Sequence, residues 1–311
     1  ISLWLDTMVA GLQAPWFGLH LRRGNSLIGA RRATYARSEV ENKSWLKNPA
    51  REDALAELLT QEWPLAGRIH HFLLPAAGWG SAVDAKEAKE LAPEAREALN
   101  AWRKSIVSKP SKKQLDQLVN LAHRVEILWR LALRRREIAE QAIRRSIPLW
   151  GRDAEEHGPA VTREEIETAL ADANGSYQRL RRVMDAWCAL WFWPLTDQLR
   201  TVRVDDGELK VGPPSLQQWI DGITELLGIH QEAGARARQS ETFGSTMSWE
   251  ELGDAEDLEL KLAGARDVDG VLKRHPWLQV TERIAQQQGF FHWELDFATV
   301  FARGGFNLQV G

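Results

Sequence analysis

A helix-periodic stretch runs from Ser111 to about Ile147 and is ended by Pro148, which cannot continue a helix. Its apolar residues recur every three or four positions, which is the spacing of one helix face. The positions that keep this spacing are Leu115, Leu118, Ala122, Val125, Leu128 or Trp129, and Ala132. A helix of this length predicts a mainly α-helical fold, in which it forms part of a long antiparallel hairpin or a helical arm.

Two further helices are predicted on the N-terminal side of this stretch. Residues 51–63 place their apolar side chains at helical intervals and are stopped by Pro64. Residues from about 84 to 107 are polar and rich in Ala and Glu, and Pro93 within them predicts a break or a second helix start.

Local signals also mark structure on the C-terminal side. In a capping box, the first and fourth side chains satisfy each other's backbone N–H groups at a helix start. The two capping boxes are Thr162 with Glu165 and Ser248 with Glu251. Between them, residues 201–212 alternate apolar and polar around Asp206-Gly207, which predicts a β-hairpin, and a helix is expected after Pro213-Pro214.

The composition allows a sizeable core, because 44% of the 311 residues are hydrophobic. The formal net charge of −3 gives no global sign of nucleic-acid or membrane binding. The charge is unevenly placed, however. Residues 101–152 hold 13 Lys or Arg against 4 Asp or Glu, whereas residues 205–270 hold 15 Asp or Glu against 5 Lys or Arg. A basic block and an acidic block therefore nearly cancel.

Cysteine and tryptophan usage narrows the class of protein. A single cysteine, Cys188, excludes an internal disulfide framework and a thiolate metal cluster, which favours a reducing, cytoplasmic location. The longest apolar run, Trp187–Leu195, is much shorter than the about 20 residues that cross a bilayer, so no membrane association is expected. The 15 tryptophans predict core packing between helices, with base stacking on exposed indoles as the alternative.

Three stretches carry a family likeness: SLWLDTM at 2–8, HLRRGNSLIG at 20–29 and FFHWELDFATVFARGGFNLQVG at 290–311. Together they resemble the large adenine-N6 DNA methyltransferases of type IIG restriction-modification and phage-defence systems, including the methylase of the DISARM system. The first looks like the helix after the acidic ribose-binding motif, the second like the Gly-Asn-Ser-Leu signature, and the third like the lead-in to the catalytic motif. Asn307 departs from this pattern, since the family usually has Asp there.

The resemblance implies a domain organisation. Residues 1–40 would be a fragment of a Rossmann-like α/β methyltransferase core, residues 41–285 a helical insertion domain with a small β-hairpin, and residues 286–311 a strand region. In the family, Asn-Pro-Pro and an aromatic residue come next and hold a flipped-out adenine. They would follow Gly311, so the expectation is an internal segment of a larger enzyme, with no catalytic residue in this chain.

The resemblance also implies S-adenosylmethionine as cofactor, contacted by Gly24, Asn25 and Ser26. Asn25 would lie near the adenine, and Gly24 would permit a close backbone approach. A doubly wound sheet binds its cofactor outside the carboxyl ends of its strands, which suits a loop at this place. From the residues alone, a tight turn at Gly24-Asn25 is the favoured interpretation, because both residues tolerate positive φ. The two interpretations are compatible.

Double-stranded DNA, and subunits of a defence system, are the partners that the resemblance implies. Basic residues of the long helix would then neutralise phosphates without reading sequence. These DNA-binding candidates are Arg124, Arg130, Arg134, Arg135, Arg136, Arg144 and Arg145. The alternative is an ordinary solvated helix face.

No metal site is predicted. Acidic residues and a lysine at 205–210 resemble a nuclease cluster, but they fall in a tight hairpin turn, which favours a solvated turn. His70, His71 and His292 lack the spacing with Glu that marks a helical zinc site and are expected to be packed or surface residues. Cys188 lies in an apolar stretch and is expected to be a small core residue.

Two functional hypotheses follow. The first is a segment of an S-adenosylmethionine-dependent DNA adenine-N6 methyltransferase, inactive by itself. The second is a non-catalytic helical module that binds nucleic acid or protein. The terminal segments should discriminate, because pieces of an incomplete sheet would leave apolar edges exposed, whereas segments that cap a complete core would favour the module.

Overall fold

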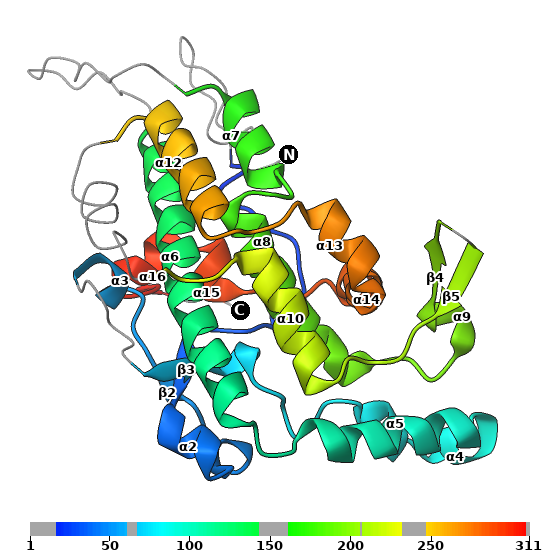
Figure 1. Cartoon of the computed structure of the whole chain (residues 1–311). Helices are drawn as coiled ribbons and strands as arrows, with labels where there is room; N and C mark the ends of the chain where they lie inside the picture. The colour runs from blue at the N-terminus through cyan, green and yellow to red at the C-terminus, as the bar shows by residue number, and fades with distance from the viewer. Residues whose placement is uncertain (1–16, 61–66, 143–160, 206, 232–246, 309–311) are drawn as a thin grey trace, which may run out of the picture.

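The computed structural model describes residues 17–60, 67–142, 161–205, 207–231 and 247–308, which are mainly helical (Figure 1). The central element is helix α6 (Lys112–Ala142). It packs against the two other core helices, α8 (Ser176–Ala189) and α10 (Leu216–Leu227), and against several further elements. The predicted long helix is confirmed as far as Ala142, and its expected end near Ile147 lies outside the described residues.

Helix α6 is central because it is apolar on several faces. Leu118, Leu121, Val125, Leu128 and Trp129 share one face and are all at most 1% exposed, and Ile127 and Leu131 on other sides of the helix are at most 2% exposed. A helix that is hydrophobic nearly all round is stable only when neighbours cover it. The helix is therefore the core of the fold, and the expected hairpin or arm was wrong.

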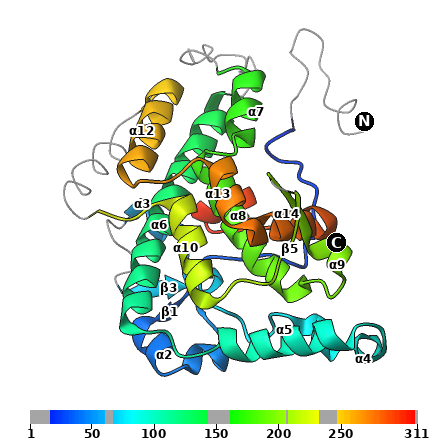
Figure 2. The ribbon, with the colours of Figure 1, turned by 45° about the vertical axis from the view of Figure 1, so that its right-hand side comes forward.

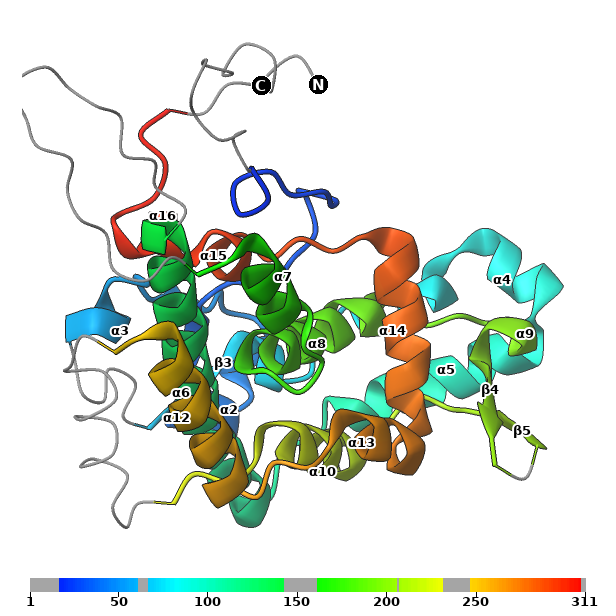
Figure 3. The same cartoon turned by 90° about the horizontal axis from the view of Figure 1, so that it is seen from above.

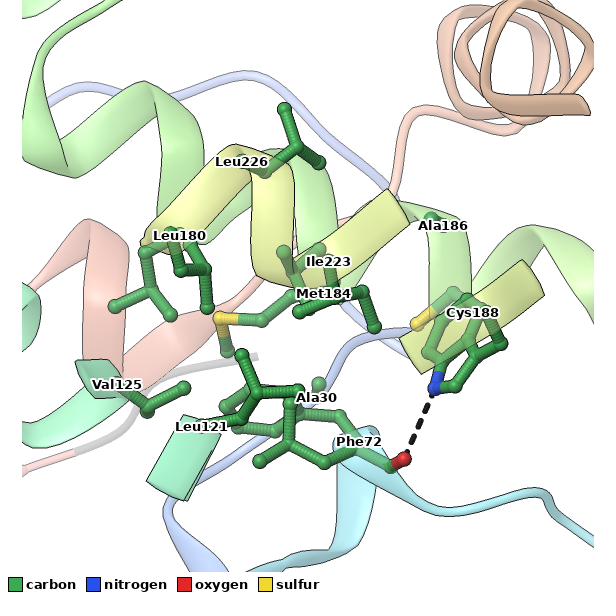
Figure 4. Close-up of a cluster of buried hydrophobic side chains, with 14 of the residues drawn as sticks. Ala30, Phe72, Leu121, Val125, Leu180, Met184, Ala186, Cys188, Ile223 and Leu226 are labelled. Carbon is green, nitrogen blue, oxygen red and sulfur yellow. Dashed lines mark hydrogen bonds between the residues drawn. The ribbon is translucent and has the colours of Figure 1, made fainter. Parts of the chain in front are cut away.

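The main core lies where three helices meet (Figure 4). Leu121 and Val125 from α6 face Leu180 and Met184 from α8, and Ile223 from α10 closes the cluster. Cys188, also on α8, is 2% exposed, and burial raises the pKa of its thiol, so it is the small core residue that the sequence predicted.

Further helices surround these three, and two of them begin at the predicted capping boxes. Thr162 Oγ1 accepts a hydrogen bond from Glu165 N, and Ser248 Oγ accepts one from Glu251 N, at 3.2 Å each. Both capping boxes are thus confirmed. The helices of this group are α7 (Arg163–Ala171), α12 (Trp249–Leu262), α13 (Val268–Arg274) and α14 (Pro276–Gln288).

A polar rod of two short helices lies at the foot of the molecule in Figures 1 and 2. It consists of α4 (Lys86–Leu91) and α5 (Pro93–Ile106), with Pro93 at the first helical position, where a missing N–H costs nothing. The predicted break is confirmed. The single-turn helices beside it and in the neighbouring loops are η2 (His71–Leu73), η3 (Ser81–Asp84) and η4 (Leu190–Phe192).

The predicted hairpin is also confirmed. Strands β4 (Thr201–Val204) and β5 (Gly207–Lys210) pair antiparallel, with Val204 opposite Gly207, and helix α9 (Asp197–Arg200) precedes them. All of β5 is exposed, and Lys210 Nζ lies 2.6 Å from Asp197 Oδ2. The solvated-turn interpretation of residues 205–210 therefore holds for those that the structure describes.

A three-stranded antiparallel sheet replaces the helix expected at residues 51–63. Its order is β2-β1-β3, and its elements and neighbours are β1 (Ala33–Ala36), α2 (Arg37–Glu41), η1 (Ser44–Leu46), β2 (Arg51–Glu52), α3 (Glu57–Thr60) and β3 (Arg68–His70). Asp53 N donates to Arg32 O, and the buried Asp53 carboxylate accepts a hydrogen bond from Thr34. These long-range bonds hold the start of the stretch extended, so within its described part only residues 57–60 are helical.

The C-terminal stretch is helical where a strand region was expected. Residues 293–302 form α15 (Trp293–Asp296) and α16 (Ala298–Ala302), and no strand occurs between 286 and 308. Gly304 and Gly305 then take φ of 101° and 94°, which ends regular structure, and Phe306 and Leu308 are 50% and 77% exposed. Residues 309–311 lie outside the described part of the chain.

The described flanking segments belong to the same core as the helices. Ala30 and Val40 on one side, and Phe290, Leu295 and Ala298 on the other, are at most 2% exposed within one continuous apolar cluster. Residues 17–32 of the expected sheet fragment form no strand apart from a single bridge.

Tryptophan supplies both apolar area and hydrogen bonds to this core. The carbonyls of Leu73, Leu74 and Pro75 accept hydrogen bonds from the indoles of Trp219, Trp187 and Trp45 at 2.9, 2.9 and 3.0 Å. Three consecutive backbone acceptors are thus satisfied by side chains from distant elements. Core packing, the first interpretation of the tryptophans, is confirmed for these three. In the part of the chain described above, no helix is long and apolar enough to cross a bilayer.

Candidate functional site

Two stretches from opposite ends of the sequence meet at one place, which we call the junction (residues 22–32 with 289–297). Asn25 N donates to Gly289 O at 2.5 Å, Phe291 N donates to Ile28 O at 2.9 Å, and Trp293 Nε1 donates to Ser26 O at 3.0 Å. Asn25 and Phe290 form a parallel bridge. In Figure 3 the dark blue N-terminal segment runs beside red α15, as these bonds require.

The predicted cofactor residues occupy a turn on the surface of the junction. Asn25 Oδ1 accepts a hydrogen bond from Leu27 N at 3.2 Å, and Ile28 N donates to Asn25 O at 3.2 Å. The tight-turn interpretation is therefore confirmed. Gly24 and Ser26 are exposed and Asn25 is half-buried, so their remaining polar groups are accessible to a ligand.

Glycine is needed in this turn for space rather than for positive φ. A Cβ on Gly24 would lie 2.7 Å from Phe291 Cδ2, and a Cβ on Gly29 would lie 1.8 Å from Phe291 O. A close approach to Gly24 was expected from a cofactor. In the structure, Phe291 of the chain itself approaches Gly24 closely.

Aromatic rings form the wall beside this turn. Trp293 lies with its ring centroid 4.9 Å from that of Phe291, 5.8 Å from Phe297 and 5.9 Å from Phe306. Trp293 and Phe297 are half-buried and Phe306 is exposed. A polar turn next to aromatic surface can bind a planar ring by stacking and by hydrogen bonds from the backbone.

Below the surface, His292 ties the junction to α8. Ala30 N donates to His292 Nδ1 at 2.9 Å, so Nε2 carries the proton and donates to Asp185 Oδ1 at 3.0 Å. His292 is completely buried, in agreement with the packed-residue expectation. Its role is to fix residue 30 against the C-terminal stretch.

His71 is held neutral in the same region. Burial, and then the neighbouring His70, lower the pKa of His71 to about 3. Arg31 N donates to His71 Nε2, and the imidazole packs edge-on against Trp187 at 4.8 Å. The histidines are thus packed residues, and no cluster of metal ligands occurs among the described residues.

The pKa of His71 predicts a pH dependence of stability. The folded-state value of about 3 lies below the ordinary 6.5, so between these limits the unfolded chain binds a proton that the folded chain rejects. The free energy of unfolding should therefore be fully retained above pH 6.5 and fall with decreasing pH, at most by about 1.4 kcal/mol per pH unit. Denaturant midpoints of wild type and His71→Gln across this window measure the effect.

The exposed His20 provides the control for this prediction. His71→Gln should flatten the pH dependence, whereas His20→Gln should leave it unchanged. Equal slopes for wild type and His71→Gln would refute the buried neutral imidazole.

The arginines predicted to bind DNA do not form an exposed basic face. Arg124 and Arg136 are 1% and 3% exposed, and Arg130 is 8% exposed. Arg124 pairs with Glu259 at 2.6 Å and Arg135 pairs with Glu256 at 2.5 Å, both carboxylates coming from α12. Arg134 pairs with Glu137 at 3.1 Å.

The sequence suggested either a DNA-binding face or a solvated face for the basic block. Neither describes the five arginines within the described residues, which are Arg124, Arg130, Arg134, Arg135 and Arg136. The acidic block folds onto the basic one, so opposite charges cancel between α12 and α6 instead of facing solvent or DNA. Arg144 and Arg145 lie outside the described residues.

Sequence reasoning missed two buried polar clusters next to the junction. In the first, Glu126 on α6 accepts hydrogen bonds from Arg32 Nη2 at 2.8 Å and Nε at 3.1 Å, and His70 Nε2 lies 2.9 Å from the same carboxylate. Arg32 and His70 are completely buried. The one signal of this cluster in the sequence was Glu126, a lone acidic residue between Val125 and Ile127.

The second cluster surrounds Tyr177 on α8. Its hydroxyl donates to Asp296 Oδ1 at 2.6 Å, and Arg181 Nη1 lies 3.1 Å from the hydroxyl and 3.3 Å from the carboxylate. Arg136 Cζ lies 5.1 Å from the Tyr177 ring centroid.

Comparison with known proteins adds no assignment for this arrangement. No protein-family model, no curated protein and no solved structure matches this chain.

Proposed function

We propose that this chain supplies the cofactor loop and the helical part of an S-adenosylmethionine-dependent DNA adenine-N6 methyltransferase of a restriction-modification or phage-defence system, acting in the cytoplasm. One observation carries the proposal. Two of the three stretches that resemble this family are in direct contact, although Ser26 and Trp293 are 267 residues apart in sequence. The stretch at 2–8 lies outside the described residues. In such an enzyme, the cofactor loop and the stretch that leads to the base-binding motif must lie side by side, because the methyl donor and the adenine react with each other.

The surface of the junction suits this role. Gly24 and Ser26 are exposed, Asn25 is half-buried, and aromatic rings lie beside them. Such a site can orient an adenosyl group by stacking and by hydrogen bonds. The cofactor would supply the methyl group, and the residues of this chain would position it. Double-stranded DNA, and subunits of a defence system, are the proposed partners of the whole protein.

An Asn25→Ala variant of the full-length protein is expected to bind S-adenosylmethionine about tenfold more weakly or worse, since it loses a ligand hydrogen bond and the turn that presents it. Titration calorimetry measures the Kd. Wild-type protein should in addition transfer a labelled methyl group to the N6 position of adenine in duplex DNA.

Asn42→Ala is the matched control, because Asn42 Oδ1 makes the same kind of local bond, accepting from Ser44 N at 2.8 Å. The Asn42→Ala variant loses an equivalent local hydrogen bond away from the junction, so its Kd for S-adenosylmethionine should equal that of wild type. Wild-type protein that neither binds the cofactor nor methylates DNA would refute the proposal.

The second candidate is a non-catalytic helical module that binds nucleic acid or protein. It is favoured by the continuity of the core, because the described flanking residues pack with the helices and both sheets that these parts form are antiparallel. Binding of a partner by full-length protein that lacks cofactor affinity would support this candidate over the methyltransferase.

A further inference from the structure

Helix α12 has two faces of different character, and its inner face is fixed against the core. Leu252, Glu256 and Leu260 recur every four positions and are at most 7% exposed. Arg135 of α6 donates a hydrogen bond from Nε to Glu256 at 3.0 Å. Figure 1 shows α12 lying along α6 at the outside of the molecule. The opposite face of α12 therefore points away from the core.

The outer face of α12 carries exposed aliphatic side chains. Leu258 and Leu262 are four residues apart, so they lie on the same face, and they are 51% and 39% exposed. Ile229, which is 52% exposed, lies beside the end of the helix, because its N–H donates to Ala263 O at 2.8 Å. Single exposed aliphatic residues are common on protein surfaces, but a group of neighbouring ones marks a surface that binds another molecule.

Charged side chains flank the leucines of this face in a defined order. Asp254 lies about one turn before Leu258, Lys261 lies about one turn after it, and all three are exposed. Asp254 and Lys261 are seven residues apart, which is close to two turns, so they lie along the same edge of the face. Exposed Glu251 extends the acidic end. We call Glu251, Asp254, Leu258, Lys261 and Leu262 the α12 patch, which is acidic at its N-terminal end, apolar at its centre and basic at its C-terminal end.

We propose that the α12 patch binds the same patch of a second copy of this chain, with the two helices antiparallel. A two-fold axis near Leu258 places Asp254 of each copy opposite Lys261 of the other copy. The leucines meet between these two contacts and are removed from water. A parallel arrangement would instead put like charges at the same level of the two helices.

The charge order of the patch is what selects this occupant. Because one end is acidic and the other is basic, the patch is its own complement when it is turned end to end, as a two-fold interface requires. The inference does not rest on the proposed methyltransferase activity.

Sedimentation velocity of the full-length protein tests the proposal at about 1 to 100 µM, since the weaker specific interfaces have micromolar Kd values. Wild type should convert from monomer to dimer as its concentration rises. Leu258→Glu places an unpaired charge at the centre of the interface and should raise the Kd of the dimer at least about tenfold. Leu91→Glu is the control, because Leu91 is 84% exposed on α4, away from the patch, and this variant should dimerise like wild type.

A charge exchange tests the antiparallel geometry. Asp254→Lys alone opposes two lysines at each contact, and Lys261→Asp alone opposes two aspartates, so each should raise the Kd of the dimer about tenfold. The double variant Asp254→Lys/Lys261→Asp opposes unlike charges again and should dimerise within about threefold of wild type. Damage to the folding of the single variants would not be reversed in this way.

Three results would overturn the proposal. Wild type that stays monomeric at all concentrations would leave the patch to a different protein, and a dimer that Leu258→Glu does not weaken would place the interface elsewhere. A double variant that binds no more tightly than the single variants would exclude the antiparallel contact. Dimerisation and cofactor affinity are measured separately, so failure of one does not bear on the other.

Discussion

A Gly29→Ala variant is expected to lose roughly 3 kcal/mol or more of its free energy of unfolding, because the new methyl group would lie 1.8 Å from Phe291 O. The clash is with backbone, which cannot rotate away as a side chain could. That backbone is also anchored, since Phe291 N donates to Ile28 O and His292 binds Ala30 N. Chemical denaturation of wild type and variant measures the loss.

Gly212→Ala is the matched control. Gly212 is exposed, and a Cβ there would meet no atom within 4 Å, so the substitution should change the free energy of unfolding by less than about 0.5 kcal/mol. A Gly29→Ala variant as stable as Gly212→Ala would show that the two stretches of the junction are not packed as described. Gly24→Ala should be intermediate, because its nearest contact is the Phe291 ring.

A Glu126→Leu variant is expected to lose about 3–5 kcal/mol of its free energy of unfolding, the usual effect of removing one partner of a buried ion pair. Arg32 is completely buried and would lose two hydrogen bonds, and His70 would lose the carboxylate 2.9 Å from its ring. The double variant Arg32→Met/Glu126→Leu should be less destabilised than the sum of the single variants, since neither charge is left unpaired.

The exposed pair Arg37–Asp116 provides the comparison. Its atoms lie 2.7 Å apart, but the side chains are 33% and 55% exposed, so Asp116→Ala should cost less than about 1 kcal/mol. Equal effects of Glu126→Leu and Asp116→Ala in chemical denaturation would contradict the buried character of the first cluster.

Elements specified by neighbouring residues could be predicted from the sequence. Helix α6 follows from apolar spacing, α7 and α12 from capping boxes, and the hairpin from alternation around Asp206-Gly207. In each case the decisive interaction joins residues within about one helical turn or across one tight turn.

The wrong predictions fall where distant contacts override local preference. Residues 51–63 have helical spacing, yet Asp53 is held extended by Thr34 and Arg32. The spacing of the arginines on α6 predicted a solvated or DNA-binding face, yet two of them, Arg124 and Arg135, form ion pairs with glutamates of α12, more than 100 residues away. A charge pattern along one helix does not specify which helix will cover it.

The sequence by itself determined a mainly helical fold, a long central helix, the positions of several helix starts and the turn at Asn25. The tertiary structure alone decided that this turn lies against residues 289–293, that Arg32, His70 and Glu126 form one cluster, and that Tyr177, Arg181 and Asp296 form another. The physical reason is that these contacts close loops of roughly 60 to 270 residues, and their partners are selected by burial and charge compensation rather than by sequence spacing.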